Sequence, residues 1–224
     1  TITVTPGSYT YAGSGQGPGI VQVNSGGSTG TITLSYVGTG TTTYGPSATA
    51  PTAAGTYTVT ASVAATATYN AASSSATAFT IGPKAASGTP NASSKTFGAV
   101  DPTFTGTLSG FVAADNVTAT YSRTVGETVA GSPYTISATL SPTGALSNYT
   151  VTSNTANFTI NKANPTITVT PLTYTYNGAA QGPGAAEVNR GGSTGTITLS
   201  YVGTGTTTYG PSATPPTAGG TYTV

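Results

Sequence analysis

The chain contains a near-copy of its own beginning. Residues 1–59 return as residues 166–224, and only 11 of the 59 aligned positions differ. The stretch 26–49 returns unchanged as 191–214, which sets the period at 165 residues. A catalytic site is needed only once, so a module copied this closely indicates that length, spacing or multivalency matters. The repeat favours a structural or adhesive protein over an enzyme.

The repeat also predicts how the chain is divided. Residues 83–163 differ from their flanks but follow the same order of strand-like runs and turns. The two complete segments end alike, with TAFTI at 77–81 and ANFTI at 156–160, each followed by a Lys-Ala pair. We therefore predict three domains of an A-B-A array: segment A (1–82), segment B (83–163) and segment A′ (164–224).

Strand signals dominate all three segments, and no amphipathic helical pattern survives the density of Gly, Pro and Thr. β-Branched or aromatic residues alternate with Thr and Ser in runs bounded by Gly, Pro, Ser and Asn. In segments A and B these runs are 1–5, 31–36, 56–64, 77–81, 103–108, 117–123, 133–140, 149–152 and 156–160. They predict an all-β fold of tandem immunoglobulin-like β-sandwich domains. The links GPKAASG (82–88) and NKANP (161–165) are short and contain Pro83 and Pro165, which favours an extended row.

Each segment carries a tyrosine in a Tyr-Thr-Val or Tyr-Thr-Ile strand that follows a Gly or Pro. These tyrosines are Tyr57, Tyr134 and Tyr222. We expect each ring to be buried and each hydroxyl to bond nearby backbone, as in a tyrosine corner.

Charge is nearly absent from the chain. Asp, Glu, Lys and Arg make up 4% of the residues, against roughly 25% in an ordinary soluble domain. None of them lies in residues 1–83, and the net charge of +1 offers no electrostatic footprint for nucleic acid. Because few groups titrate, stability should depend weakly on pH between pH 5 and 8.

His, Cys, Met and Trp are all missing. No disulfide can form, the soft metal ligands are lacking, and so are the residues most easily oxidised. These absences favour the outside of a cell, although drift within a Thr-, Ala- and Gly-biased repeat would also produce them. No apolar run is long enough to span a membrane, and no signal peptide opens the chain, so secretion signals would lie outside this segment.

Segment A′ stops at Val224, without a counterpart of Thr60–Ile81. The loss of core strands should expose a sheet edge and apolar surface. We expect either that the chain is an excerpt of a longer polypeptide, or that another chain supplies the missing strand by β-augmentation.

Candidate catalytic and metal-binding groups are few. Catalysis by Ser–His–Asp or Cys–His groups is impossible here. Ser94 and Lys95 are adjacent on a strand and point to opposite faces. The carboxylates Asp101, Asp115, Glu127 and Glu187 are too dispersed for a glycosidase pair, and Asp115-Asn116 lacks the remaining ligands of a calcium loop, so a polar turn is expected there. The glycines of Gly13–Gly19 fit loops better than a phosphate site, since no GKS or GKT sequence follows. We assign no catalytic, cofactor-binding or metal-binding residue and expect no cofactor.

Few side chains offer a site for covalent modification. A Lys–Asn crosslink assisted by an acid is conceivable only in segment B, with Lys95 and either Asp101 or Glu127, and is not favoured. Asn91, Asn116, Asn148 and Asn157 lie in N-x-S/T sequons, which arise readily by chance in a chain this rich in Thr. Most tyrosines recur at strand-like spacing and should pack in cores. Tyr44, in a turn-like stretch, is the one to test for exposure.

Segment B contains a set of short motifs that occur together in one known family: Phe97-Gly98, Asp101-Pro102, Ser109-Gly110-Phe111, Asp115-Asn116, Tyr121-Ser-Arg123, Gly126-Glu127, Tyr134-Thr-Ile136, Asn148-Tyr149 and Phe158-Thr-Ile160 with Lys162-Ala163. Through these motifs, segment B resembles the MBG-type immunoglobulin-like domains of large bacterial surface adhesins and filaments. Segments A and A′ look like a sister type, carried by Tyr9-Thr-Tyr11, Gln16-Gly17-Pro18, Tyr44-Gly45-Pro46 and Gly55-Thr-Tyr57. The resemblance implies tandem sandwich modules at a bacterial cell surface or in a secreted filament, and it implies no catalytic residues.

Three functional hypotheses follow. The first is a non-catalytic stalk of a surface adhesin or filament, in which copy number sets reach. The second is a set of repeats that themselves bind a glycan or a partner surface by avidity. The third is an accessory region beside an unseen catalytic domain. The expected partners are neighbouring repeats of the same or identical chains, through a fibre or β-augmentation, and surface glycans, but not nucleic acid.

Overall fold

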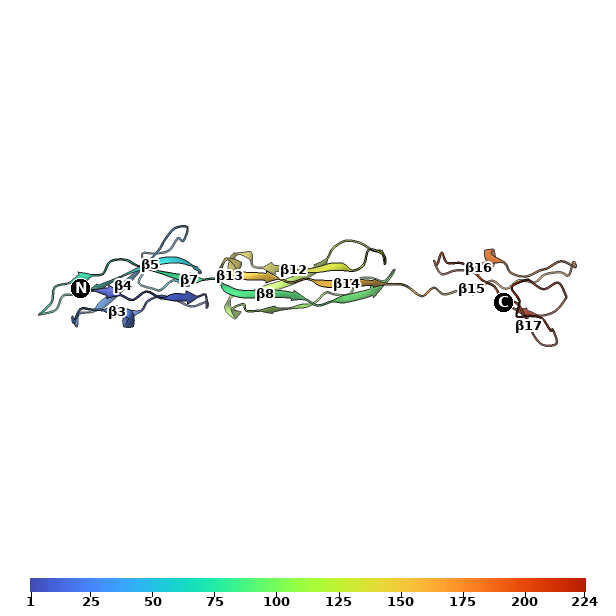
Figure 1. The fold of residues 1–224 in the computed structure, drawn as a ribbon, viewed down its shortest axis with the longest axis horizontal. Helices are drawn as coiled ribbons and strands as arrows, with labels where there is room; N and C mark the ends of the chain where they lie inside the picture. Colours follow the sequence, from blue (N-terminus) through green and yellow to red (C-terminus); the bar gives the residue numbers. More distant parts are fainter. The chain divides into compact units, whose positions relative to one another are not determined.

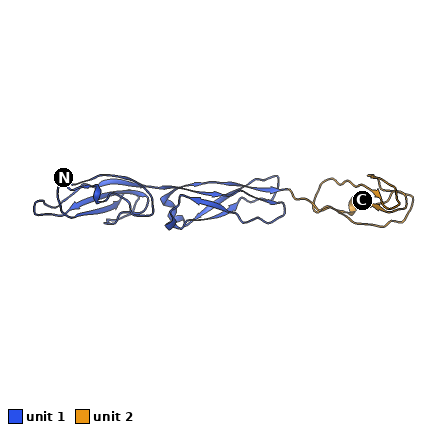
Figure 2. Cartoon of the chain, turned by 90° about the horizontal axis from the view of Figure 1, so that it is seen from below, with its two compact units in different colours: residues 1–161 blue, residues 162–224 orange.

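The computed structural model describes residues 1–224 as two compact units, unit 1 (residues 1–161) and unit 2 (residues 162–224) (Figure 2). Regular structure is almost entirely β, which confirms the all-β prediction. The exceptions are four short 3₁₀ turns: Ile20–Gln22 (η1), Ala113–Asp115 (η2), Thr143–Asn148 (η3) and Ala185–Glu187 (η4). No helix has the length and hydropathy needed for a transmembrane span. The division into segments A, B and A′ stays a prediction.

Segment A contains one five-stranded and one two-stranded sheet (Figure 1). The larger sheet has the order β2-β7-β5-β4, with β6 paired to β5. Its strands are β2 (Ser8–Thr10), β4 (Ile32–Gly38), β5 (Gly55–Val63), β6 (Ala72–Ser73) and β7 (Thr77–Gly82). The smaller sheet pairs β1 (Thr3–Val4) with β3 (Val23–Asn24). All neighbours are antiparallel except β2 and β7, which run in the same direction.

Alternation along β5 explains where the core of segment A lies. Tyr57, Val59, Ala61 and Val63 are all at most 2% exposed, and the residues between them are less buried. Successive strand residues point to opposite faces, so these four face inward together. Phe79 of β7 completes this core, with its ring stacked on Tyr57 at a centroid distance of 5.4 Å.

Segment B contains two sheets, ordered β10-β8-β13 and β11-β12-β14-β9 (Figure 1). Their strands are β8 (Lys84–Pro90), β9 (Ser93–Thr96), β10 (Gly106–Ser109), β11 (Thr118–Arg123), β12 (Tyr134–Ser141), β13 (Tyr149–Ser153) and β14 (Ala156–Asn161). Two pairings are parallel, β8 with β13 and β9 with β14. The core gathers around Ile136, Phe158 and Ile160, each at most 1% exposed.

The interpretation of residues 82–88 as a link was wrong. Residues 84–90 form β8, the central strand of the three-stranded sheet, and only Pro83 separates it from β7. Ala, Gly and Pro are depleted in strands, so the run KAASGTP gives no local strand signal. The strand packs against apolar side chains, because a Cβ on Gly88 would be in ordinary van der Waals contact, at 3.5 Å, with both Leu108 and Leu140.

Unit 2 repeats residues 1–59 of segment A, with much less regular strand pairing. It has two short antiparallel pairs, β15 (Thr168–Val169) with β16 (Val188–Asn189), and β17 (Val202–Gly203) with β18 (Tyr222–Thr223). Tyr201 is still buried, at 2% exposure, but Tyr176 is 69% and Val224 is 42% exposed. The expected exposure of apolar surface is therefore confirmed.

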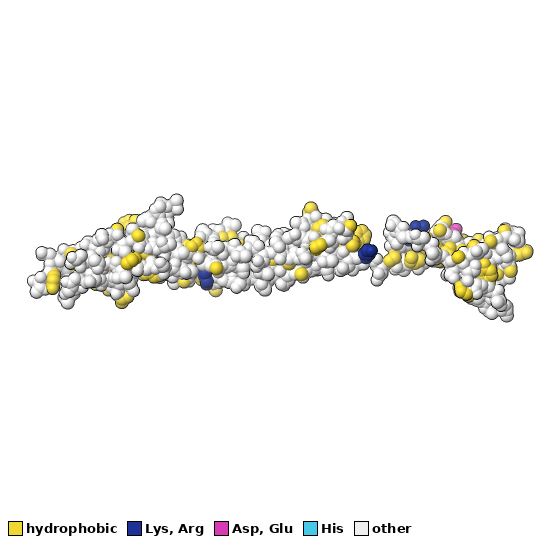
Figure 3. Space-filling model, viewed as in Figure 1, with side chains coloured by type: hydrophobic (Ala, Val, Ile, Leu, Met, Phe, Trp, Pro, Cys, Tyr) yellow, Lys and Arg dark blue, Asp and Glu magenta, His cyan; other side chains and the backbone are white.

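The surface is mostly polar and uncharged. In the space-filling view, white atoms of backbone and polar side chains cover most of the visible face, and charged groups occupy only a few spots (Figure 3). Thr and Ser side chains and peptide groups therefore provide most of the contact with water.

Candidate functional site

One polar site in unit 1 is a joint between segments A and B. The Asp115 carboxylate, at the end of η2, accepts a hydrogen bond from the Tyr11 hydroxyl, with its two oxygens 2.8 and 2.9 Å away. It also accepts one from the Tyr149 hydroxyl, which in turn accepts a bond from the Val112 N–H at 2.9 Å. One carboxylate thus connects the end of β2 in segment A to β13 in segment B.

The two tyrosine rings make this joint apolar as well as hydrogen-bonded. Tyr11 and Tyr149 are 5% and 7% exposed, and their rings meet edge to face at 5.3 Å. Burial, followed by the bond to Asp115, raises the pKa of Tyr11 to about 12. The same causes, in the same order, raise the pKa of Tyr149. Both hydroxyls are therefore held in the neutral, donating form.

Further contacts surround this joint. The Asn148 side-chain oxygen accepts a bond from the Ala54 N–H at 2.9 Å. Gly13 has a φ of 76°, and a Cβ there would lie 2.7 Å from a Val112 methyl group. A larger residue at position 13 would be strained and would also push the segments apart.

A second polar cluster lies within segment B. The Arg123 guanidinium binds Asp101 through Nε at 2.6 Å and Nη2 at 3.0 Å, and it also pairs with Glu127. The Lys95 ammonium lies 2.7 Å from Asp101 and 2.5 Å from Glu127. The guanidinium carbon lies 4.7 Å from the centroid of the buried Phe158 ring. The cluster covers the apolar core of segment B with paired charges.

The pKa shifts in this cluster are those of mutually stabilised ions. Bonds from Arg123, then Lys95, lower the pKa of Asp101 to about 2. Bonds from Lys95, then Arg123, lower the pKa of Glu127. The pKa of Lys95 is raised, first by its bond to Asp101. All three groups are therefore charged at neutral pH and bonded to one another.

The contacts of Lys95, Asp115 and Glu187 can be compared with the roles that the sequence suggested for them. Lys95 is bonded to carboxylates rather than to an asparagine, which does not support a Lys–Asn crosslink. Asp115-Asn116 forms the expected turn, with Asn116 in the left-handed region at φ 49° before β11. Glu187 lies in unit 2, where its carboxylate accepts a bond from the Gly184 N–H at 2.7 Å. No three side chains of the types that bind metals gather at one place.

The tyrosine-corner prediction is confirmed for Tyr57, whose ring is 1% exposed and whose hydroxyl donates to the Ala53 carbonyl at 2.8 Å. Tyr222 makes the same bond to the Ala218 carbonyl at 2.7 Å, and Tyr134 bonds the Thr128 carbonyl at 3.0 Å. Tyr44 is half-buried, edge to face with Tyr57 at 5.9 Å, so it is mainly a packing residue. Tyr69, Tyr174 and Tyr176 do not have the predicted core role, since they are 47%, 41% and 69% exposed.

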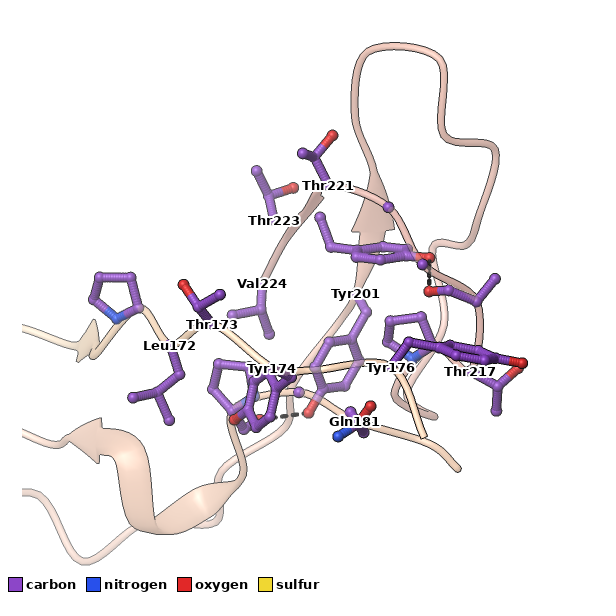
Figure 4. A pocket seen from close by; sticks show the side chains of 18 of the residues that line it. Leu172, Thr173, Tyr174, Tyr176, Gln181, Tyr201, Thr217, Thr221, Thr223 and Val224 are labelled. Carbon is purple, nitrogen blue, oxygen red and sulfur yellow. Dashed lines mark hydrogen bonds between the residues drawn. The ribbon is translucent and has the colours of Figure 1, made fainter. Parts of the chain in front are cut away.

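Unit 2 has an open apolar groove of about 600 Å³ (Figure 4). Four tyrosines line it, Tyr174, Tyr176, Tyr201 and Tyr222, together with Val224. None of the residues that line it carries a charged side chain. The sequence predicted exposed apolar surface here but not a groove, because a groove depends on how distant loops are arranged around the tyrosine rings.

The comparisons with known proteins agree with this picture of segment B. Residues 88–159 match the family model of the MBG domain of the YGX type. The suspected MBG-type domain is thus present, and such domains are repeat domains of extracellular proteins. The match includes the charged cluster and the segment B side of the joint. Neither the search of curated proteins nor that of solved structures found a match.

Proposed function

We propose that this chain is a non-catalytic structural region of a bacterial cell-surface adhesin or secreted filament. In this proposal, segments A, B and A′ are tandem immunoglobulin-like β-sandwich domains that extend in a row. The function is mechanical: each segment adds length, and the joint at Asp115 holds neighbouring segments together. The extracellular setting of MBG domains supports this proposal.

The observation that carries the proposal is the direction of the first and last strands. Near the start of segment A, β2 runs parallel to the last strand, β7. In segment B, β8 and β9 run parallel to β13 and β14. A chain whose first and last strands are parallel enters a segment at one end and leaves at the other. Tandem copies of such segments gain reach instead of folding back.

The sandwich architecture is supported by the way sheets cover the cores. The core of segment A includes Val4 of the two-stranded sheet and Ile2 just before it, together with Tyr57 and Phe79 from the five-stranded sheet. In segment B, a Cβ on Gly88 of β8 would lie 3.5 Å from Leu140 of β12, so the two sheets approach each other closely. Two sheets enclosing one apolar layer is the arrangement of a sandwich.

A chain in which residues 1–165 occur twice tests the proposal by small-angle X-ray scattering. Residues 84–96 cross segment B, and 13 extended residues span about 40 Å at about 3.3 Å each. Two segments in a row should therefore lengthen the maximum dimension by about 80 Å. Compact packing would raise the radius of gyration by only about 4 Å. A radius of gyration that rises by only about 4 Å over that of the natural chain would contradict the proposal.

Glycan binding by avidity is the second candidate. Two aromatic side chains, Tyr69 and Phe97, are 47% and 53% exposed and could stack on sugar rings. A glycan array probed with the same single-repeat and double-repeat chains separates the candidates. Signal that grows steeply with repeat number and is lost in Tyr69→Ala or Phe97→Ala would favour binding over a purely structural role.

A further inference from the structure

Tension along the chain reaches each segment of unit 1 through the strands at which the chain enters and leaves it. In segment A, β2 is the first strand of the larger sheet and β7 the last, and the two run in the same direction. In segment B, the first strands β8 and β9 run in the same direction as the last strands β13 and β14. A pull on the two ends of such a segment acts along the paired strands, whereas their hydrogen bonds lie across them. These bonds are therefore loaded together, in shear, instead of opening one after another.

The strand that takes up this load on entry differs between the two segments. In segment A it is β2, a three-residue edge strand whose only partner is β7, through Ser8–Thr10 and Thr80–Gly82. The shorter β1 before it pairs with β3 at two positions. In segment B the entering strand is β8, a seven-residue central strand that pairs with β13 at five positions and with β10 at four. Strand β8 is thus held from both sides and β2 from one.

The strands at which the chain leaves each segment are held more evenly. In segment A, β7 pairs with β2 at three positions and with β5 at five. In segment B, β14 pairs with β9 at four positions and with β12 at three. The difference in resistance between the segments therefore lies in the entering strand.

Side chains increase the same difference. Lys95 of β9 is anchored by its ammonium group, which lies 2.7 Å from Asp101 and 2.5 Å from Glu127, and its side chain is 6% exposed. This anchor holds β9 in place when β14 is pulled along it. Segment A has no charged side chain with which to anchor β2 in this way. The hydroxyl of Tyr11, just after β2, bonds Asp115 of segment B instead of a group in its own segment.

We propose that segment A is the yielding element of unit 1 under tension and segment B the load-bearing one. Strand β2 leaves its sheet first, and segment A lengthens while segment B stays folded. The chain then takes up a pull by extending in one segment without losing the other. This inference rests on the proposed structural function, since only a chain held at both ends experiences such tension.

Single-molecule force spectroscopy on the full chain tests the proposal. The natural chain has no Cys, so pairs of introduced cysteines define the points of attachment. Thr1→Cys with Lys84→Cys loads segment A, and Lys84→Cys with Asn161→Cys loads segment B. The rupture force of segment B should exceed that of segment A about twofold, because more backbone hydrogen bonds hold its entering strand.

A third attachment is the matched control for the direction of the pull. Thr118 and Ser141 are paired at the same end of β11 and β12, so Thr118→Cys with Ser141→Cys opens their bonds one after another. This pull should rupture segment B at roughly half the end-to-end force or less, because the bonds no longer share the load. None of the five replaced residues is buried, and denaturant midpoints equal to that of the natural chain confirm that the variants are folded.

Two results would overturn the proposal. One is a rupture force for segment A that equals or exceeds that of segment B. The other is a rupture force for segment B that is the same in both directions of pull, because shear would then not be the source of its resistance. Either result in a chain that X-ray scattering shows to lengthen with each added repeat would refute the order of yielding and leave the structural function standing.

Discussion

At the scale of single residues, tyrosine both fills the apolar cores and donates hydrogen bonds to loop carbonyls, roles that several residue types share in ordinary domains. Tyr36 and Tyr57 bury their rings in the core, and their hydroxyls bond the carbonyls of Pro18 at 2.7 Å and Ala53 at 2.8 Å. Each side chain thus supplies apolar area and also satisfies a loop carbonyl that would otherwise lack a donor. A chain without Trp, Met or Cys can build its cores in this way.

Removal of one such hydroxyl gives a direct measure of its contribution. Tyr57→Phe keeps the ring but leaves the Ala53 carbonyl without its donor, so unit 1 should lose about 1 kcal/mol of unfolding free energy. Tyr222→Phe removes the equivalent bond in unit 2, where the hydroxyl is exposed and water can replace it. Its effect should be smaller. Denaturant midpoints of the two variants at unchanged m-value check this, and equal losses would contradict it.

At the scale of elements, the strands and turns differ in how far local sequence determines them. The runs 31–36, 56–64 and 77–81 were predicted from alternation and are the strands β4, β5 and β7. Strands β8 and β9 were missed, because KAASGTP and SSKT have no apolar alternation. They exist because their backbones pair in parallel with β13 and β14, whose residues lie 65 positions further along the chain.

The same distinction applies to the joint. Asp115 was correctly placed in a polar turn, but its bonds to Tyr11 and Tyr149 were not foreseen. These bonds join residues that are 104 and 34 positions apart, and neither motif spacing nor composition predicts contacts between residues so distant in the sequence. The only feature of the sequence that pointed to a role for Asp115 was that it is an isolated carboxylate in a chain with almost no charge.

Substitution of Asp115 should loosen segments A and B from each other. Asp115→Ala removes the acceptor of two buried hydroxyls, and a loss of about 2 kcal/mol is expected, since each bond involves a charged group. The pKa of Tyr11 should then fall from about 12 toward 10, because one cause of its shift is gone while burial remains. Ultraviolet titration of tyrosinate measures this. Asp115→Asn, which keeps the shape without the charge, is the matched variant.

The sign of the alkaline effect follows from the raised pKa. A tyrosine whose folded pKa lies above its unfolded value of about 10 stabilises the protein below pH 10, and that stability is lost as pH rises through about 12. The natural chain should therefore lose stability between pH 10 and 12. The Asp115→Asn variant should show a shallower loss. A steeper one would exclude Asp115 as a cause of the shift.

At the scale of the whole molecule, four of the nine charged side chains lie in one cluster. Segment A has no charged side chain, and segment B concentrates Lys95, Asp101, Arg123 and Glu127 in a single cluster. The rest of the surface depends on neutral hydrogen-bonding groups, as Figure 3 shows for one face. Such a molecule has few ways to respond to pH or salt.

Stability should therefore be flat between pH 5 and 8 and fall again in acid. The pKa of Asp101 is lowered to about 2, below its unfolded value of 3.8. A lowered carboxyl pKa stabilises the fold above the unfolded pKa, and that contribution is lost as pH falls from about 4 through about 2. Glu127, whose pKa is also lowered, acts in the same direction. Thermal midpoints at a series of pH values measure the profile. Asp101→Asn should lower the midpoint at pH 7 and flatten the acid limb, because the group that titrates there is gone. A midpoint that moves strongly between pH 5 and 8 in the natural chain would mean that a titrating interaction other than this cluster supports the fold.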